Sequence, residues 1–530
     1  MENRLTNESF TAVYSVLNPS GIRPTVDRIP LSPRLASLKG KVVYFVEALR
    51  DAVPDLLEEL AKRLPQYAPG VKTVYRKKPT GWQTDHPETW NEVVQKADAM
   101  VSGIVQGASS GAFCVPWIVG VEKRGVPTVF LVGRPFDKYY IPISNEMFGM
   151  PALRCIGIDL IPEHEMPNVT EVQYKEILFK IIDGLTKPLT EEEKKAGKIV
   201  PKQPRIAMTG TFEEVQDFFL EKRWTDGLPI VPPTEKKVVG MLKGTSHAPD
   251  EVVKTKFQEQ ISINTYTVEK VAIVGVMAGC KPEYMPVLLA IAEALGPVAS
   301  GQASPSSMPL MTVANGPIRN EIGMNRGLGS LGPGNQANAT IGRFVRLAVI
   351  ALAGLIPGFN DMTGMGNPAK YVFCFPENEE DSPWEPFHVS NGYKPNESIV
   401  SVFGGGTSYK TLISVDSPDF ILERITKLRT GSMFLMDPFM AGFYAKRGMS
   451  KKDVEQYIWE HTLDPVIERK KSMLDPKQRV QYDKMPDDAL LPVYERDSVR
   501  IIIAGPECGI PTTQAWSFSR PVMASVDKWR

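Results

Sequence analysis

Three of the five cysteines stand where a thiol could do chemistry. Cys114, Cys280 and Cys508 each follow an apolar run typical of a buried strand, and each lies within a few residues of a glycine and a proline. Because open α/β sheets bind ligands at the carboxyl ends of their strands, we predict that at least one of these thiols is catalytic or lines a site. The alternative is chance placement of small packing residues, which is our interpretation of Cys155 and Cys374.

The loop before Cys114 could lower the pKa of its thiol. The string GASSGA precedes it, and we expect a helix to begin there, with Ser109 or Ser110 as its cap and Pro116 in its first turn. A helix N-terminus favours thiolate over thiol, which would make Cys114 a nucleophile or a redox thiol. Ser109, Ser110 and Gly111 would contact the substrate, because a glycine lets a ligand approach the backbone. The alternative is a buried cysteine in a tight strand–helix turn.

A second candidate is the segment 315–343, which holds seven glycines, five asparagines and three arginines and is therefore unsuited to a core. Its amides and backbone N–H groups favour binding of a carboxylate, a phosphate or a developing oxyanion, and it leads into an apolar helix that Asn338 or Thr340 could cap. The residues expected to line this site are Asn315, Asn325, Arg326 and Asn335. The alternative is a long ordered loop that bridges subunits or domains.

An acidic segment, 376–388, gathers five carboxylates and His388 around a tryptophan. Paired carboxylates could act as acid and base or hold a divalent cation, while a solvated acidic loop is the alternative. Glu377 and Asn378 directly follow the strand-like run YVFCF, so we expect them to point into a cleft.

These segments carry a family resemblance. ASSGAFC, followed by EKRGVPTVFLV, resembles the active-site segment of the UGSC family, named for its selenocysteine-Gly-Ser-Cys motif, and is more distantly similar to the selenocysteine domain of component B of glycine and betaine reductases. Glu122, Gly125 and Pro127 match the end of the acidic helix in those families. Further blocks, among them TDGLPIVPPT and the Asn/Gly segment, extend the resemblance over most of the chain. Only Cys114 remains of the motif's cysteines, so the vicinal redox pair is absent.

The elements that must position these residues predict an α/β protein. Apolar runs at 41–49, 97–105 and 126–133 alternate with helical segments, which favours a doubly wound parallel sheet in an N-terminal domain, residues 1–188. A charged stretch over 189–206 suits a linker. Residues 207–530 are expected to form a larger α/β or α+β catalytic or substrate-binding region, with two subdomains as an option; here 271–279 is expected to be a strand.

Composition excludes several classes of partner. Lys+Arg and Asp+Glu balance at 61 each, so no nucleic-acid or membrane surface is expected. The N-terminus lacks the basic start and apolar core of a signal peptide, and unpaired cysteines suit a reducing compartment, so we expect a cytoplasmic protein. The histidines show no metal-ligand spacing; no metal and no cofactor is evident.

We therefore predict a cytoplasmic enzyme, in a homo-oligomer, that acts on a small polar or anionic substrate by cysteine-dependent chemistry. The family resemblance implies a reductase-like or thiol-exchange activity. Because motif cysteines are missing, a non-redox lyase, hydratase or hydrolase that uses the Asn/Gly-rich segment is an alternative. A binding or scaffold protein with a degenerate redox loop is another.

Overall fold

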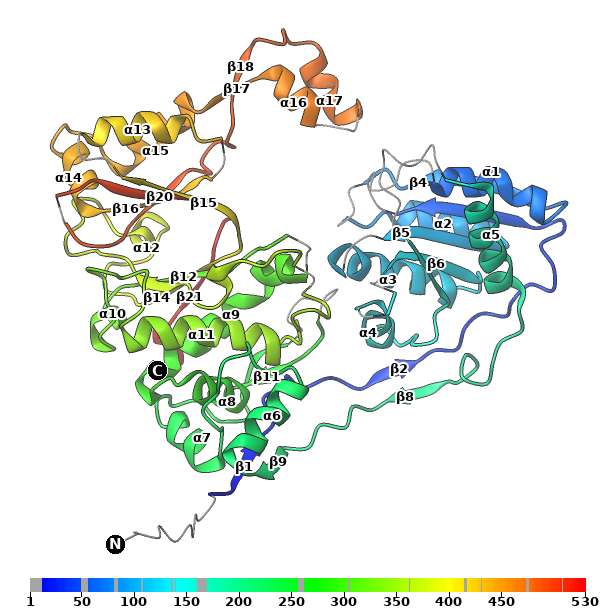
Figure 1. Cartoon of the computed structure of the whole chain (residues 1–530), viewed down its shortest axis with the longest axis horizontal. Helices are drawn as coiled ribbons and strands as arrows, with labels where there is room; N and C mark the ends of the chain where they lie inside the picture. The colour runs from blue at the N-terminus through cyan, green and yellow to red at the C-terminus, as the bar shows by residue number, and fades with distance from the viewer. Residues whose placement is uncertain are drawn as a thin grey trace, which may run out of the picture.

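A computed structural model of the chain describes most of its residues. The described ranges are 12–48, 56–80, 84–105, 108–134, 137–138, 140–159, 169–255, 262–303, 306–361, 363–413, 417–429, 431–472, 476–507 and 509–530. They form an N-terminal α/β domain and a larger region, which two long segments running side by side connect (Figure 1).

The N-terminal domain is built on a five-stranded parallel sheet of order β4-β3-β5-β6-β7. Its strands are β3 (Val42–Glu47), β4 (Lys72–Lys77), β5 (Ala99–Val105), β6 (Thr128–Gly133) and β7 (Cys155–Ile158). The central strands are buried on both faces, which is why their sequences are continuous apolar runs rather than alternating patterns. Strands β3, β5 and β6 lie within the apolar runs predicted from the sequence at 41–49, 97–105 and 126–133.

Helices cover both faces of this sheet. They are α1 (Leu56–Tyr67), α2 (Pro87–Lys96), α3 (Ala108–Lys123), α4 (Tyr140–Met147) and α5 (Glu171–Thr186). Phe45 and Val101 pack with α1 and α5 on one face, whereas Tyr44, Met100 and Phe130 pack with α2 and α3 on the other. The predicted doubly wound fold is therefore confirmed.

The two connecting segments pair with each other. Strand β2 (Val26–Arg28) is antiparallel to β8 (Gly197–Ile199), which lies in the charged stretch expected to be a linker. Further along, β1 (Tyr14–Leu17) pairs antiparallel with β9 (Ile206–Gly210). The beginning of the described chain is thus paired with the larger region. In Figure 1 this pairing lies at the opposite end of the two connecting segments from the N-terminal sheet.

A helical layer forms the base of the larger region. Its elements are α6 (Phe212–Glu221), α7 (Glu235–Leu242), β10 (Val252–Lys254), β11 (Tyr266–Thr267), α8 (Val268–Ala278), η2 (Pro282–Tyr284), α9 (Met285–Val298), η3 (Ala299–Ala303) and α11 (Gln336–Ala351). The expectation of a strand over 271–279 is wrong, because α8 occupies it. This helix packs against α7, α9 and α11 and is buried on all sides, so its apolar run has no polar face that would reveal a helical period.

Two four-stranded sheets follow, with orders β13-β12-β14-β21 and β15-β20-β16-β19. The first contains β12 (Met311–Asn315), β13 (Cys374–Pro376), β14 (Ile399–Phe403) and β21 (Val522–Ser525). The second contains β15 (Gly405–Ile413), β16 (Met433–Met436), β19 (Arg500–Ile503) and β20 (Thr512–Phe518). An apolar core that includes Phe375 and Phe403 from one sheet and Leu435 and Trp516 from the other joins them.

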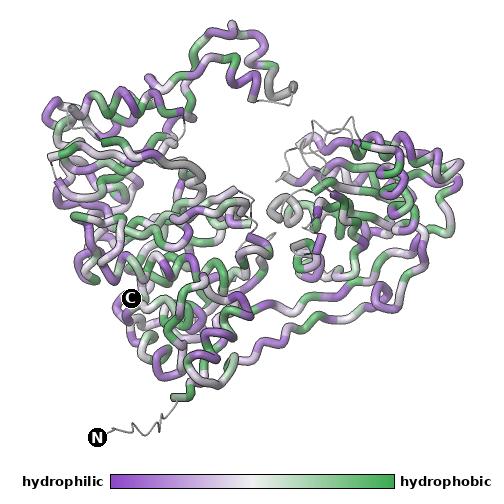
Figure 2. Tube along the Cα trace, viewed as in Figure 1, coloured by the Kyte–Doolittle hydropathy of each residue, from purple (hydrophilic) through white to green (hydrophobic). Residues whose placement is uncertain are grey.

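The remaining elements lie around these sheets. They are α10 (Ile318–Glu321), η4 (Pro368–Lys370), α12 (Phe387–Ser390), α13 (Pro418–Thr426), α14 (Pro438–Ala445), α15 (Lys451–His461), β17 (Leu463–Pro465), α16 (Val466–Ser472), α17 (Pro476–Asp483), β18 (Leu490–Pro492) and η5 (Asp527–Trp529). The segment with α16 and α17 projects from the body and is largely hydrophilic (Figure 2). Within the described ranges, no helix is both long enough and apolar enough to cross a membrane.

Candidate active site

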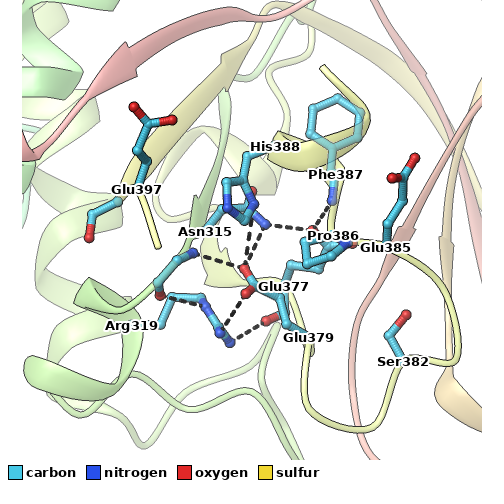
Figure 3. Close-up of polar contacts among 12 residues, drawn as sticks. Asn315, Arg319, Glu377, Glu379, Ser382, Glu385, Pro386, Phe387, His388 and Glu397 are labelled. Carbon is cyan, nitrogen blue, oxygen red and sulfur yellow. Dashed lines mark hydrogen bonds and ion pairs between the residues drawn. The ribbon is translucent and has the colours of Figure 1, made fainter. Parts of the chain in front are cut away.

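Polar side chains meet where β12 and β13 end. The two strands are parallel, and Ala314 pairs with Pro376, so Asn315 and Glu377 leave the sheet side by side. The backbone N–H of Glu377 extends the ladder by donating to the carbonyl oxygen of Ala314 at 3.0 Å. The two side chains belong to segments 62 residues apart in the sequence, yet they are hydrogen-bonded (Figure 3).

The carboxyl group of Glu377 is sealed from solvent. Its Oε2 accepts hydrogen bonds from Asn315 Nδ2 at 2.5 Å and from the backbone N–H of Phe387 at 2.7 Å. Burial raises the pKa of Glu377, although the ammonium of Lys451 and these two hydrogen bonds oppose the rise. The group is thereby biased toward the protonated form, which can donate a proton from its other oxygen, Oε1.

Arg319 closes one side of the cluster. A turn at Gly316, where φ is +79° and a Cβ would collide with a carbonyl oxygen, leads the chain from β12 into α10. The Arg319 side chain, 4% exposed, then donates to the carbonyl of Glu377 at 2.8 Å and forms ion pairs with Glu379 at 2.8 Å and Glu380 at 3.0 Å. This arginine compensates two partly buried carboxylates at once.

Glu380 shows the effect of that compensation. Its partial burial acts to raise its pKa, but hydrogen bonds from Arg319 and Asn320 outweigh it and hold the pKa at about 2. Arg326 adds a further ion pair to Glu380 at 3.1 Å. Two neighbouring carboxyl groups of the acidic segment thus have pKa values shifted in opposite directions, as in sites where one acid is protonated and another ionised.

His388 lies on α12 above these carboxyl groups and is fully buried (Figure 3). Burial lowers the pKa of the imidazole, while Glu379, whose Oε1 lies 3.8 Å from Nδ1, and nearby carbonyl groups act to raise it. Within the described residues, neither ring nitrogen makes a hydrogen bond of normal geometry, and the same holds for Glu377 Oε1 and Asn315 Oδ1. Buried polar atoms are rarely left unpaired, so this group of atoms is suited to a substrate or water.

A pocket of about 400 Å³ is lined in part by α12, through Phe387 and Ser390. Phe387 and Lys451 belong both to its wall and to the surroundings of Glu377, because Phe387 donates its N–H to that carboxyl and Lys451 acts on it electrostatically. Lys451, Lys452 and Arg500 contribute three cations to the lining, against two carboxylates, Glu455 and Asp497. The excess of positive charge suits an anionic ligand.

Asn378 has a different role from the one expected. It was predicted to point into a cleft with Glu377, but it is fully buried and fixes the first sheet to the second. Its backbone N–H donates to the carbonyl of Ile503 and its side-chain amide to the carbonyl of Gly505, both at 2.8 Å. The prediction is corrected because the protein itself uses these donors, so Asn378 positions Glu377 rather than contacting a ligand.

The thiol of Cys114 lies in a quite different environment. Helix α3 begins at Ala108, so Cys114 is in its second turn, and Pro116 is inside the helix rather than in its first turn. The side chain is 0% exposed in an apolar cluster with Val115 and Ile118. Burial raises the pKa of Cys114 to about 12, although the ammonium of Lys78 opposes the rise. The expectation of a thiol activated by a helix terminus is therefore wrong.

Comparison with known proteins bears on this N-terminal part. The model described as the UGSC family matches residues 15–191. We call these matched residues, 15–191, the UGSC region. The resemblance inferred from ASSGAFC is thereby confirmed, whereas the distant similarity to the reductase component and the resemblance of the later blocks stay predictions. Among curated proteins, the comparison gave no match.

The rest of the motif loop in the UGSC region is packed as well. Gly111 is buried against Ile141 of α4, so it allows close packing of two helices rather than approach of a ligand. Ser109 and Ser110 follow the first residue of α3 and so do not precede the helix as caps; their side chains lie outside the described part of the structure. None of the three pockets described here is lined by Cys114.

The other two candidate thiols lie outside the UGSC region. Cys280 follows the helix α8 and its left-handed cap Gly279, not a strand, and burial raises the pKa of Cys280 to about 12 against the effects of Thr340 and Arg343. Cys508 lies outside the described residues. The expectation that all three thiols sit at strand ends therefore fails for Cys280.

Asparagine side chains of the Asn/Gly-rich segment mainly form hydrogen bonds to the segment's own backbone. Asn335, not Asn338 or Thr340, caps α11, and its amide also donates to the carbonyl of Gly323 at 2.9 Å. Asn338, 2% exposed, donates to the carbonyls of Asn325 and Ser330 at 2.9 and 3.0 Å. Of the four residues predicted to line a site, Asn315 and Arg326 reach the carboxylate cluster. Asn325 and Asn335 instead hydrogen-bond to the segment's own backbone.

Residues that sequence reasoning missed are chiefly cations. Neither Arg319 nor Lys451 was predicted from the sequence. Arg319 forms an ion pair with Glu379, and the ammonium of Lys451 acts electrostatically on the buried carboxyl group of Glu377. Lys451 follows the helix cap Ser450, a signal that indicates a helix start but not the burial of the next side chain. The sequence indicates such cations only indirectly, because an acidic segment that becomes buried needs positive charges from elsewhere in the chain.

Proposed function

We propose that this protein is an enzyme that performs acid–base, non-redox chemistry of the lyase, hydratase or hydrolase type on a small anionic substrate. The observation that supports it is the buried cluster of Glu377, Asn315 and His388, which has unpaired polar atoms beside a pocket lined with cations. The cysteine-dependent alternative has less support, because burial keeps Cys114 protonated. The cytoplasmic setting stays part of the proposal, supported by four described free thiols.

The roles follow from the protonation states that the surroundings favour. Glu377, whose pKa burial raises, would act as general acid through Oε1, since Oε2 already accepts two hydrogen bonds. His388, whose pKa burial lowers, would be neutral and act as base. In a hydratase-type elimination, His388 takes a proton from carbon and Glu377 gives one to the departing hydroxyl, which leaves as water.

The pocket cations would hold the substrate's anionic group. Lys452 lies on α15 and Arg500 at the start of β19, while Lys451 both lines the pocket and acts electrostatically on Glu377. A substrate in this pocket would rest against α12, the short helix that carries His388. Charge-assisted hydrogen bonds of this kind fix orientation as well as affinity.

A screen that detects proton transfer directly would test this function. The full chain is incubated in D₂O with small hydroxy and unsaturated carboxylic acids, and exchange of carbon-bound hydrogen or addition of water is followed by ¹H NMR. We expect exchange with the wild type, and loss of it in Glu377→Gln and His388→Asn. Glu385→Gln removes an exposed carboxyl of the same segment and serves as the matched control.

Three results would argue against the proposal. Unchanged exchange in both Glu377→Gln and His388→Asn would exclude the cluster as the reacting site. Loss of activity in Cys114→Ser, with the fold intact by circular dichroism, would favour the thiol-dependent alternative. Absence of any turnover across the acids would support the binding or scaffold alternative instead.

A further inference from the structure

A second charged pocket, of about 290 Å³, lies away from α12, between α11 and the glycine-containing segment 357–371. Arg346, Asp361, Thr363 and Lys370 are among its polar lining residues. None of the residues that line it belongs to the cluster around Glu377 or to the first pocket. It therefore calls for an explanation separate from the proposed active site.

One carboxylate in this pocket is shared by two cations. Asp361, whose side chain is 2% exposed, accepts from Arg346 at 2.8 Å and from Lys370 at 2.8 and 3.0 Å. Thr363 donates to Asp361 at 2.5 Å and accepts from Lys370 at 2.6 Å. Burying two cations against one anion is costly, and a second anion from outside would relieve that cost.

The remaining donors of Arg346 are available to such an anion. Besides Asp361, its guanidinium donates to Gln302 at 3.3 Å, so among the described residues it uses two of its five N–H groups. The flat fork of an arginine matches the oxygen pairs of carboxylate and phosphate groups. Lys370 is the second cation of the lining and carries a compact ammonium group. Burial lowers the pKa of Lys370, while Asp361 opposes that shift.

A further carboxylate in the lining of the pocket is already paired with an arginine. Asp226, which also lines it, is neutralised by Arg343 through two contacts of 2.9 and 3.0 Å, so it does not cancel the charge of Arg346 and Lys370. Arg343 also donates to the carbonyls of Leu228 and Pro229, which ties the TDGLP turn to α11. The TDGLP turn and the helix α11 therefore line the same pocket.

The segment 357–371 contributes Gly358, Gly364 and Gly366 to the lining of the pocket. Gly358 and Gly366 have φ values of +71° and +84°, and at both positions a Cβ would meet open space, so their use is conformational. Met365 between them is fully exposed.

From this geometry we propose that the pocket formed by Arg346, Asp361 and Lys370 binds a small oxyanion, a carboxylate or a phosphate, through the guanidinium of Arg346 and the ammonium of Lys370. Asp361 acts as an internal anion that holds the two cations in place and competes with the ligand. The site is independent of the proposed acid–base cluster, since it stands on other elements and requires no catalysis.

Titration calorimetry of the full chain tests it, with inorganic phosphate in one arm and succinate in the other, since these represent the two sources of the oxyanion. We expect binding in at least one arm at millimolar concentration. Lys370→Met and Arg346→Met should each weaken it about tenfold or more, because each removes charge-assisted hydrogen bonds to the anion. Lys281→Met, an exposed lysine elsewhere, is the control.

Asp361→Asn gives the decisive result, because it has the opposite sign. It preserves shape while removing the competing charge, so affinity should rise about tenfold, and salt should weaken binding more steeply than in the wild type. This variant decides the matter even if Arg346→Met fails to fold. The proposal is overturned if neither anion binds the wild type, if Asp361→Asn does not tighten binding, or if Lys370→Met binds as the wild type does.

Discussion

The N-terminal domain and the larger region end their strands in contrasting ways. In the UGSC region β5 leads toward α3, where Cys114 is packed among hydrocarbon side chains. In the larger region β12 and β13 lead into segments that bury Asn315 and Glu377 beside a pocket. Burial raises the pKa of both Cys114 and Glu377. The consequences differ, because a protonated thiol is a poor nucleophile whereas a protonated carboxyl group is a useful acid.

The two regions also differ in whether their buried groups need partners of opposite charge. Cys114 is surrounded by apolar neighbours and needs no partner while it is neutral. The carboxylates around Glu377 need Arg319 and Lys451, which the chain supplies from two other elements, α10 and α15. An expensive polar arrangement of this kind is typical of a functional site, while a sealed cysteine is typical of a core.

The largest effect expected is on turnover. Glu377→Gln should lower the rate of carbon–hydrogen exchange by about 10²-fold or more, since general acid–base groups contribute roughly 10²–10⁴-fold. The shape of the side chain is retained, so the loss would come from the missing proton. Initial rates by NMR measure it, with Glu385→Gln expected to retain full activity; equal rates in the two variants would remove the functional contrast between the regions.

Removing Arg319 should produce the largest effect on stability. Arg319→Met leaves Glu379 and Glu380 without their main cation, and breaking a buried pair in this way costs about 3–5 kcal/mol. Arg326→Met removes a more exposed partner of Glu380 and should cost at most about 1 kcal/mol. Urea unfolding of both variants measures the difference. Similar small losses would mean that the cluster is solvated rather than buried.

The opposite pKa shifts of Glu377 and Glu380 should appear as opposite pH dependences. The folded-state pKa of Glu377 is raised, so its favourable contribution is present below pH about 4.5 and is lost as the pH rises. The stability advantage of the wild type over Glu377→Gln should therefore fall with rising pH. For Glu380, whose pKa is about 2, the advantage over Glu380→Gln should instead grow as the pH rises from about 2 through about 4.5.

Thermal unfolding across pH 2–7 gives both differences, provided that unfolding is reversible. The two variants serve as controls for each other, because they change neighbouring positions by the same substitution. Slopes of equal sign would contradict the division of the acidic segment into a protonated and an ionised carboxyl group.

The smallest effect is expected in the UGSC region. Native Cys114 should react with iodoacetamide far more slowly than a free thiol, because burial raises its pKa to about 12 and shields the sulfur atom. Cys114→Ser should leave the exchange rate unchanged. Peptide mass spectrometry after timed alkylation provides the measurement; rapid labelling of Cys114 at neutral pH would reverse the distinction between the two regions.

Much of the fold could be predicted because its signals are local. Continuous apolar runs marked β3, β5 and β6, and their alternation with helical segments indicated a doubly wound sheet. The capping box of Ser450 and Asp453 at the start of α15 is another signal of this local kind. The run at 271–279 misled because a helix buried on all sides has no polar face, so its apolar pattern equals that of a buried strand.

The candidate site was predictable only in part. The order of residues placed Glu377 just after a strand-like run and Asn315 at the start of the Asn/Gly-rich segment, and the structure brings these two together. The position of Cys114 after a small-residue loop indicated equally well a reactive thiol or a buried one. Local sequence contains no measure of how deeply a side chain is finally buried.

The sequence by itself therefore determined the central strands of the N-terminal sheet and the family resemblance of residues 15–191. Tertiary structure alone decided which side chains lose contact with water and which cations reach them. A pKa depends on desolvation and on charges within a few ångströms, and those charges come from segments far apart in the chain. For this reason Arg319 and Lys451, rather than any motif, determine the state of the carboxyl groups around Glu377.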